Sequence, residues 1–266
     1  MLSDYLVFTD LDGTLLNHHD YSFAEAAEAL SFLQKKSIPL IIVTSKTFAE
    51  VKLLQEKLNI KCPFIVENGA GIFIPSASPI ASSVDCDDPY IKITQAQTYL
   101  ELRIFFKKVQ REYTIRGFGD MQVKEVMELT SLDEASAINA MKRDFTEPFI
   151  LEGEVDIEAL KKEAMKEGLD IVKGGRFFHL VSKGQDKAYA MKHLTHLFEE
   201  FLDKKMRMIA LGDSANDFTM LKAADIGVLI PLHDGTYADI ADKTVMKSPY
   251  AGPKGWNKTL MEILDV

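Results

Sequence analysis

The chain has 266 residues, of which 47% are hydrophobic and 27% are charged, a balance typical of globular domains. This length is enough for one large domain or two modest ones. The net charge of −9 argues against nonspecific binding to nucleic acid or to an anionic membrane, so an anionic substrate must be held by a few local cations or by a metal ion.

The cysteines and the N-terminus indicate the compartment. Cys62 and Cys86 are the only cysteines, so the sequence encodes neither a disulfide framework nor a zinc-ligand spacing. The first ten residues, MLSDYLVFTD, lack a basic region followed by a long apolar stretch, and no run reaches membrane-spanning length. We therefore expect a cytoplasmic protein that acts on a small phosphorylated molecule and binds neither nucleic acid nor a membrane; the pattern carries no signal for its oligomeric state.

The first third of the chain alternates short apolar runs with amphipathic stretches. We expect strands at residues 5–8, 40–43 and 64–66. Between them we expect one helix that starts at a Ser22 cap and runs through Lys36, and a second that starts at a Thr47 cap and ends near Leu58. Continuous apolar strands separated by amphipathic helices are typical of a parallel sheet covered on both faces.

The pattern changes after Ile74. The Pro-, Ser- and Asp-rich residues 75–89 indicate a linker. Beyond it the expected elements are mixed: helices at 98–111 and 132–143, a strand at 149–151, a helix capped by Asp156 and closed by Gly168, and a strand at 177–181.

The alternation of apolar strands and amphipathic helices seen in the first third then returns. We expect a helix at 185–201, a strand at 208–211, a helix after Asn216 and a strand at 226–230. One domain interrupted by an insertion explains this order better than two domains in series. We therefore predict an α/β fold with a doubly wound, mostly parallel, Rossmann-like sheet formed by residues 1–80 and 184–266. An α/β domain spanning residues 81–183 is inserted into it.

Polar side chains follow four of the expected strands. Each group alone is typical of a turn or a helix cap. Together they would meet at the carboxyl edge of a parallel sheet, where ligands bind. Two acidic clusters at one edge repel each other unless a cation lies between them, and hard oxygen ligands in an open site suit Mg²⁺. The groups are Asp10 and Asp12, Thr44 and Ser45, Glu67 and Asn68, and Asp213, Asn216 and Asp217.

Carboxylates around Mg²⁺ indicate phosphoryl transfer, in which the metal neutralises charge and the protein positions the reacting group. One aspartate of the pair Asp10 and Asp12 could attack phosphorus, while the other, on the same side of an extended chain, acts as acid and then base. Thr44 could hydrogen-bond a phosphoryl oxygen. Lys187 could supply a fixed positive charge, although a lone lysine is more often a solvated helix residue.

The motifs "DLDGTLL", "VTSKT", Lys187 and "GDSAND" resemble, in order, the four motifs of the haloacid dehalogenase superfamily of phosphotransferases. The resemblance implies that Asp10 is the nucleophile and Asp12 the general acid and base. It implies that Mg²⁺ is held by the Asp10 carboxylate, the Asp12 backbone carbonyl and Asp213, with support from Asn216 and Asp217. An insertion after "ENGA" is similar to the α/β cap, the substrate-specificity domain, of the Cof-like branch.

Finer signatures narrow the resemblance. "TSLDEASAINAMKRDFTEPFIL", "GGRFFHL" and "GPKGW" resemble the mannosyl-3-phosphoglycerate phosphatase family, and "TSKT" stands where related sugar phosphatases have "TGR". The implied reaction releases mannosylglycerate, a compatible solute. Phosphatases of glucosyl-3-phosphoglycerate or sucrose phosphate are close alternatives.

A substrate that carries a carboxylate and a phosphate needs cationic side chains outside the metal site. The cationic candidates are Lys46, Arg143 and Arg176. With the polar residues Ser45, Glu67 and Asn68 at the strand ends, they make up the expected substrate-binding residues. Arg143 could instead form an ion pair with Asp144 or Glu147. His179, within an apolar strand, is interpreted as a core or edge histidine, and Trp256 as a packing anchor for the last helix.

Two other functions remain open. A hexose phosphomutase would use the same nucleophile, but it would need a second phosphate site. A non-catalytic phosphate sensor usually lacks a catalytic carboxylate, whereas Asp10, Asp12, Asp213 and Asp217 are all present here.

Overall fold

The computed structural model describes residues 4–81, 88–173 and 177–264, which form two compact units. The first unit comprises Met1–Thr44, Ile60–Lys92 and Asp186–Val266, and the second comprises Ser45–Asn59 and Ile93–Gln185. The chain therefore leaves the first unit twice, and residues 45–59 pack with the second unit. The division into a catalytic core and a specificity cap stays a prediction.

The first unit is built around an eight-stranded sheet whose order is β12-β11-β10-β1-β2-β3-β4-β5. The pairs from β12 to β3 are parallel, and only the β3–β4 pair among those with a described register is antiparallel. The strands are β1 (Tyr5–Thr9), β2 (Leu40–Val43), β3 (Phe64–Val66), β4 (Gly71–Pro75), β5 (Tyr90–Thr94), β10 (Arg207–Gly212), β11 (Ile226–Leu229) and β12 (Met246–Lys247).

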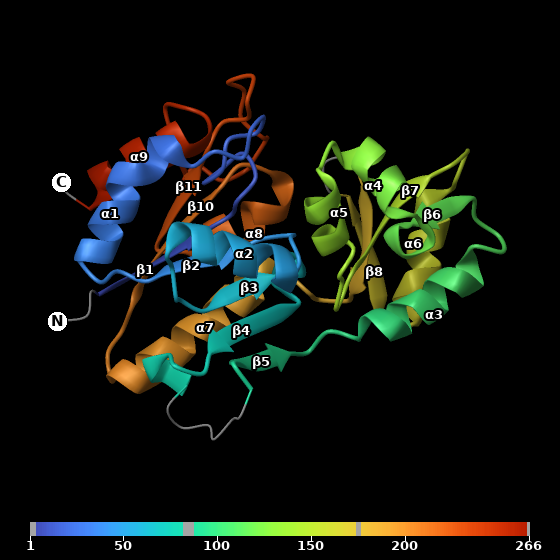
Figure 1. Ribbon diagram of the computed structural model, residues 1–266, viewed down its shortest axis with the longest axis horizontal. Helices are drawn as coiled ribbons and strands as arrows, with labels where there is room; N and C mark the ends of the chain where they lie inside the picture. The colour runs from blue at the N-terminus through green and yellow to red at the C-terminus, as the bar shows by residue number, and fades with distance from the viewer. Residues whose placement is uncertain (1–3, 82–87, 174–176, 265–266) are drawn as a thin grey trace. The chain divides into compact units, whose positions relative to one another are not determined.

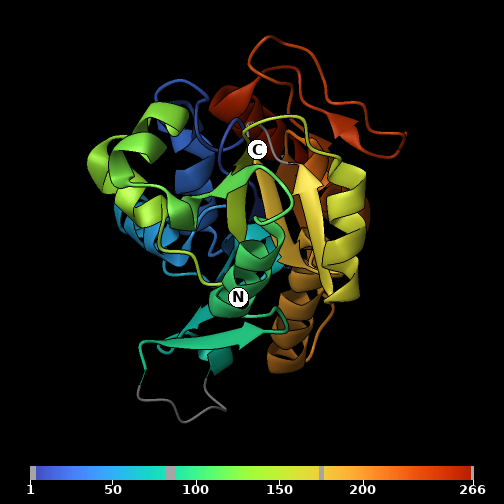
Figure 2. The ribbon, with the colours of Figure 1, turned by 90° about the vertical axis from the view of Figure 1, so that its right-hand side faces the viewer.

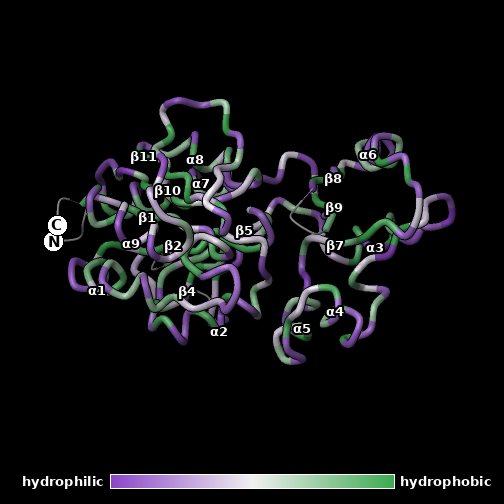
Figure 3. Tube along the Cα trace, turned by 90° about the horizontal axis from the view of Figure 1, so that it is seen from above, coloured by the Kyte–Doolittle hydropathy of each residue, from purple (hydrophilic) through white to green (hydrophobic). Residues whose placement is uncertain are grey.

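Strand β1 lies at the centre of this sheet, and Figure 3 shows its apolar residues beside those of β2 and β10. Leu6, Val7 and Phe8 are fully buried, as expected for a strand covered on both faces. The chain order runs one way from β1 to β2 and the other way from β1 to β10, so a topological switch point lies at the carboxyl end of β1. The predicted doubly wound, mostly parallel sheet is confirmed.

Figure 1 shows the helices of the first unit on both faces of its sheet. They are α1 (Ala27–Lys35), α7 (Lys187–Leu202), α8 (Phe218–Ala223) and α9 (Gly252–Ile263). The expected Ser22 cap was wrong: the Ser22 hydroxyl accepts the Ala24 N–H locally, a short turn follows, and α1 begins at Ala27. Among the described residues, no helix has the length and apolar character needed to cross a membrane.

The second unit contains a four-stranded antiparallel sheet of order β6-β7-β9-β8. Helices α3 and α6 pack on one face and α4 and α5 on the other, as Figure 2 shows. The elements are α2 (Phe48–Leu58), α3 (Tyr99–Val109), β6 (Ile115–Gly117), α4 (Val123–Thr130), α5 (Glu134–Ala140), β7 (Glu147–Leu151), α6 (Ile157–Lys166), β8 (Leu169–Lys173) and β9 (Phe178–Ser182).

Helix caps account for most of the correct boundaries in the second unit. Thr47, Thr98 and Asp156 each accept a backbone N–H of the first helical turn, as their positions before apolar-periodic segments predicted. The helix expected at 132–143 is shorter, because Asp133 caps α5 and the chain turns after Ala140.

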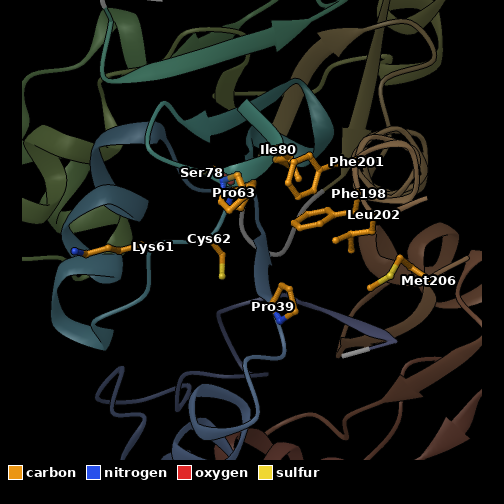
Figure 4. A pocket seen from close by; sticks show the side chains of 11 residues that line it. Pro39, Lys61, Cys62, Pro63, Ser78, Ile80, Phe198, Phe201, Leu202 and Met206 are labelled. Carbon is orange, nitrogen blue, oxygen red and sulfur yellow. The ribbon is translucent and has the colours of Figure 1, made fainter. Parts of the chain in front are cut away.

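A cavity of about 140 Å³ lies in the first unit at the edge opposite the strand carboxyl ends (Figure 4). Pro39, Pro63 and Met206 line it, and each directly precedes a strand of the parallel sheet. Its other lining residues are mostly apolar, and Lys61 is the one charged group among them. The cavity is therefore unsuited to a phosphate ester, and the ligand site lies elsewhere.

Helix α9 fixes the end of β1. The Trp256 indole is fully buried, and its N–H donates to the Thr9 hydroxyl at 3.0 Å. That hydroxyl in turn donates to the Asp10 carbonyl at 2.7 Å. The interpretation of Trp256 as a packing anchor is confirmed. Through the Thr9 hydroxyl, this anchor is connected to the backbone of Asp10, the first acidic residue of the site.

We expect Trp256→Phe to lower the free energy of unfolding by about 1–3 kcal/mol, because it removes the hydrogen bond to Thr9 and leaves a small cavity. Tyr250→Phe, at a position 45% exposed, is the control and should change it by less than about 0.5 kcal/mol. Chemical denaturation measures both. Equal stability of the two variants would contradict the anchoring role.

Candidate active site

Four adjacent strands deliver polar residues to one edge of the large sheet. Asp10 follows β1, Thr44 follows β2, Glu67 follows β3, and Asp213 follows β10. The strands β10, β1, β2 and β3 are parallel neighbours in that order, so their carboxyl ends lie side by side. The sheet topology therefore brings together the residues that the sequence placed at strand ends.

Lys187, the first residue of α7, supplies the positive charge. Its ammonium group donates to Asp10 Oδ1 at 2.7 Å and to Asp217 Oδ1 at 2.6 Å. The lysine is 1% exposed and Asp217 is fully buried, so these contacts form in a medium that screens charge weakly. The alternative of a solvated surface lysine is wrong.

Asp217 holds the loop after β10 as well as the lysine. Its Oδ2 accepts the backbone N–H groups of Asp213 and Ser214, both at 3.1 Å. A Cβ at Gly212 would lie 2.5 Å from the Asp217 Cβ, so the last residue of β10 has to be glycine for this packing. Asp217 thus fixes the backbone that carries Asp213.

Asp213 faces Asp10 and the turn after it. One carboxylate oxygen each from Asp10, Asp213 and Asp217 lies within 4.8 Å of the others. Asp213 Oδ1 is buried and has no hydrogen-bond partner among the described residues. Gly13, with φ of +76°, makes room for this carboxylate, since a Cβ there would lie 2.4 Å from Asp213 Oδ2. A buried carboxylate oxygen without a partner, beside two further acids, fits a cation site.

Burial and mutual repulsion disfavour ionisation of these acids. Burial, and to a lesser degree Asp217 and Asp12, raise the pKa of Asp10 to about 7 against the attraction of Lys187. Burial, Asp10 and Asp217 together raise the pKa of Asp213 to about 8. For Lys187 burial acts to lower the pKa, but the two carboxylates outweigh it and raise the pKa above its usual value. One ammonium group therefore does not balance the acids, and a further cation is required for full ionisation.

The turn after β3 positions α7. Glu67, Asn68 and Gly69 all have positive φ, and the Asn68 N–H donates to the Thr44 carbonyl at 2.9 Å. A Cβ at Gly69 would lie 2.2 Å from the Asp186 carbonyl, which immediately precedes Lys187. The close approach of this turn to the start of α7 sets where the lysine enters the site. Neither Gly69 nor Gly13 was identified from the sequence, although Asn-Gly and Asp-Gly are turn dipeptides.

The remaining expected residues of the first unit lie around this centre. Asp12 is half-buried, and its charge contributes to the raised pKa of Asp10. Thr44 is 1% exposed, and Glu67 is fully buried. The Asn216 amide donates to Asn68 Oδ1 at 3.2 Å and accepts from the Ser214 hydroxyl, so Asn216 supports the loops around the acids.

Among the expected substrate-binding residues of the second unit, Arg143 and Ser45 contact each other, whereas Lys46 lies beside Glu50. The Arg143 guanidinium donates to the Ser45 carbonyl at 3.1 Å. Lys46 lies 3.8 Å from Glu50, one helical turn away. Glu147 binds Arg103 at 3.1 Å and the Gly119 N–H at 2.9 Å. Arg176 lies outside the described residues.

Sequence comparison relates the chain to a known protein family. A family model for haloacid dehalogenase-like hydrolases matches residues 7–248. The chain is 47% identical over 262 residues to a glucosyl-3-phosphoglycerate/mannosyl-3-phosphoglycerate phosphatase of Persephonella marina, covering 98% of this chain and 97% of the relative. It is 31% identical to a mannosyl-3-phosphoglycerate phosphatase of Pyrococcus furiosus, over 85% of this chain and 90% of that one.

The fold agrees with this comparison. A solved structure from Thermoplasma acidophilum matches with a TM-score of 0.71 at 18% identity, covering 100% of this chain and 99% of that one. A sugar phosphatase of haloacid dehalogenase subclass IIB matches with a TM-score of 0.65 at 17% identity, covering 98% and 100%. The chain belongs to the haloacid dehalogenase-like hydrolase family, as its four motifs predicted. Phosphatases of this superfamily use a divalent metal, and the acidic cluster fits one.

We expect Lys187→Met to lower the free energy of unfolding by about 3–5 kcal/mol, because it leaves two buried carboxylates without their cation. The loss should be larger at pH 8 than at pH 5.5. At the lower pH, below the pKa of about 7 for Asp10, protonation of that carboxyl relieves the repulsion. Denaturation at the two pH values measures the difference.

Lys205→Met is the matched control. Lys205 binds Glu199 at 2.9 Å with a side chain that is 91% exposed, so its removal should change the free energy of unfolding by less than about 0.5 kcal/mol at both pH values. A Lys187 variant that behaved like this control would contradict the charge balance described above.

Proposed function

We propose that this enzyme hydrolyses mannosyl-3-phosphoglycerate to mannosylglycerate and inorganic phosphate. The observation that carries the proposal is the contact of Lys187 with both Asp10 and Asp217 beside Asp213, at the carboxyl edge of the sheet. This arrangement offers a nucleophile, a fixed cation and metal ligands in one place. The substrate class is supported by the printed names of relatives that span nearly the whole chain.

In the proposed reaction, the Asp10 carboxylate attacks phosphorus, and the bond from phosphorus to the glycerate oxygen breaks. Asp12 gives its proton to that leaving oxygen. A water molecule, deprotonated by Asp12, then attacks the aspartyl-phosphate, and the bond from phosphorus to Asp10 breaks to release phosphate. The Lys187 ammonium holds the attacking carboxylate in place, with Oδ1 of Asp10 fixed at 2.7 Å. The Thr44 hydroxyl donates to a phosphoryl oxygen.

We propose Mg²⁺ as the metal, held by Asp10, the Asp12 backbone carbonyl and Asp213, with Asp217 and Asn216 fixing the loop around it. Hard oxygen donors in an open site favour Mg²⁺ over softer metals. When bound, the ion neutralises charge on the transferring phosphoryl group. The unpartnered Oδ1 of Asp213 supports this assignment.

Glucosyl-3-phosphoglycerate is the second candidate substrate, because the name of the 47% identical relative includes both sugars. A panel containing mannosyl-3-phosphoglycerate, glucosyl-3-phosphoglycerate, sucrose phosphate and hexose phosphates tests the choice by release of phosphate. The proposal expects release from the two sugar phosphoglycerates. Isomerised hexose phosphate without free phosphate would indicate a phosphomutase, and binding without turnover a sensor.

We expect Asp10→Asn to reduce kcat for the sugar phosphoglycerate by at least about 10³-fold, because the amide is a poor nucleophile. The control is Asp4→Asn, at a residue that precedes β1 and so lies at the opposite edge of the sheet. It should retain full activity. Turnover by Asp10→Asn at a rate near that of the control would defeat the proposed mechanism.

Mg²⁺ should stabilise the fold more at pH 8 than at pH 5.5. The pKa values of Asp10 and Asp213 are raised to about 7 and about 8, so in chelator their ionisation destabilises the folded state as pH rises from about 4 towards 8. Mg²⁺ binds the ionised carboxylates and offsets this loss.

Thermal unfolding with and without Mg²⁺ at the two pH values measures the effect. Asp213→Asn should raise the metal-free Tm at pH 8 and abolish most of the Mg²⁺-induced shift. A shift that is equal at both pH values, or that survives in Asp213→Asn, would rule out these carboxylates as the metal ligands.

A further inference from the structure

The imidazole of His179, in the second unit, is deeply buried, and its Nδ1 has no hydrogen-bond partner among the described residues. The residue is 9% exposed, and Nδ1 is buried with no partner within the part of the chain that the structure describes. Buried polar groups are normally paired, and an unpaired one destabilises the fold that contains it. His179 therefore requires an explanation beyond packing.

The surroundings of His179 within the sheet do not supply a partner. In β9 it lies opposite Pro148 of β7 and Val172 of β8. Proline has no backbone N–H, and valine has no polar side chain. His179 also lies on the sheet face opposite the one to which Leu180 and Phe149 contribute their apolar core. An apolar residue of similar size would satisfy this position better than histidine does.

The charge state of the imidazole limits what it can recognise. Burial and, to a lesser degree, the nearby Arg143 guanidinium lower the pKa of His179 to about 3, so the ring is neutral at physiological pH. A neutral imidazole has one N–H donor and one acceptor nitrogen, which together suit a hydroxyl group. An anion would be held better by the guanidinium beside it.

Arg143 connects this position to the second motif. Its guanidinium donates to the carbonyl of Ser45, the residue that follows Thr44 in the chain. A neutral imidazole and a guanidinium are thus neighbours within the second unit. One is matched to a hydroxyl and the other to a carboxylate, and a sugar acid presents both groups.

We propose that His179 is a specificity-determining residue that hydrogen-bonds a hydroxyl group of the sugar-acid part of the substrate, beside Arg143, which pairs with its carboxylate. This inference rests on the proposed function. It replaces the interpretation of His179 as a core or edge histidine.

The test is His179→Phe, which keeps the ring and the burial but removes both nitrogens. Steady-state kinetics are measured with mannosyl-3-phosphoglycerate and with p-nitrophenyl phosphate, a phosphate ester that lacks the sugar acid. We expect kcat/KM for the sugar substrate to fall about 10- to 100-fold, mainly through KM, because a site built to bind a hydroxyl loses its partner. The value for p-nitrophenyl phosphate should stay within about twofold.

Thermal unfolding of the same variant separates recognition from structure. Removing an unpaired buried polar group should leave Tm unchanged or raise it. His179→Gln, which keeps a donor and an acceptor, should retain more kcat/KM for the sugar substrate than His179→Phe does. His196→Gln is the matched control, because His196 is exposed and pairs only with Glu200 among the described residues, at 3.3 Å.

Three results would count against the inference. An unchanged kcat/KM for the sugar substrate in His179→Phe would overturn it. So would a lowered Tm with equal losses on both substrates, which marks a structural residue. A wild-type enzyme that hydrolyses p-nitrophenyl phosphate but no sugar phosphoglycerate would instead overturn the proposed function, and this inference with it.

Discussion

The shared ammonium group of Lys187 is the interaction on which this site depends. It binds Asp10 and Asp217 at 2.7 and 2.6 Å in a buried environment, yet Asp213 lies in the same cluster without a cation of its own. One positive charge among three carboxylates leaves an excess of negative charge, and burial together with this repulsion raises the pKa values of Asp10 and Asp213. The cluster is therefore not a balanced salt bridge, and its net negative charge suits a divalent cation.

Much of the rest of the first unit maintains this arrangement. Gly13 and Gly69 permit close approaches that any side chain would block, at Asp213 and at the start of α7. Trp256 holds the end of β1 through the Thr9 hydroxyl. The positive φ angles of Glu67 and Asn68 and the buried Asp213 Oδ1, which has no partner among the described residues, disfavour folding locally, and they gather where chemistry is expected. The cavity at the opposite edge is lined mostly by apolar residues, with Lys61 as the one charged group.

The sequence predicted β1, β2, β3, β10 and β11 of the first unit, because buried parallel strands are continuous apolar runs whose polar ends fall at one edge, but it missed β4, β5 and β12. Asp10, Lys187 and Asp217 were identified by motif, but their contacts required the fold. The strands β6 and β8 were missed, since short antiparallel strands carry little periodicity, and Ser22 misled because a local turn competed with the cap. Nothing in the apolar context of His179 indicated that its Nδ1 would lack a partner among the described residues, since that depends on neighbours such as the opposing Pro148.

The most direct test of the central claim is calorimetric titration of Mg²⁺ into the metal-free protein at pH 6.5, in buffers of different ionisation enthalpy. The account predicts one Mg²⁺ bound per chain with release of protons, because the ion displaces them from Asp10 and Asp213. The Asp213→Asn variant should bind far more weakly. Tight binding without proton release, or binding unaffected by that substitution, would contradict the claim that these acids share a divalent cation.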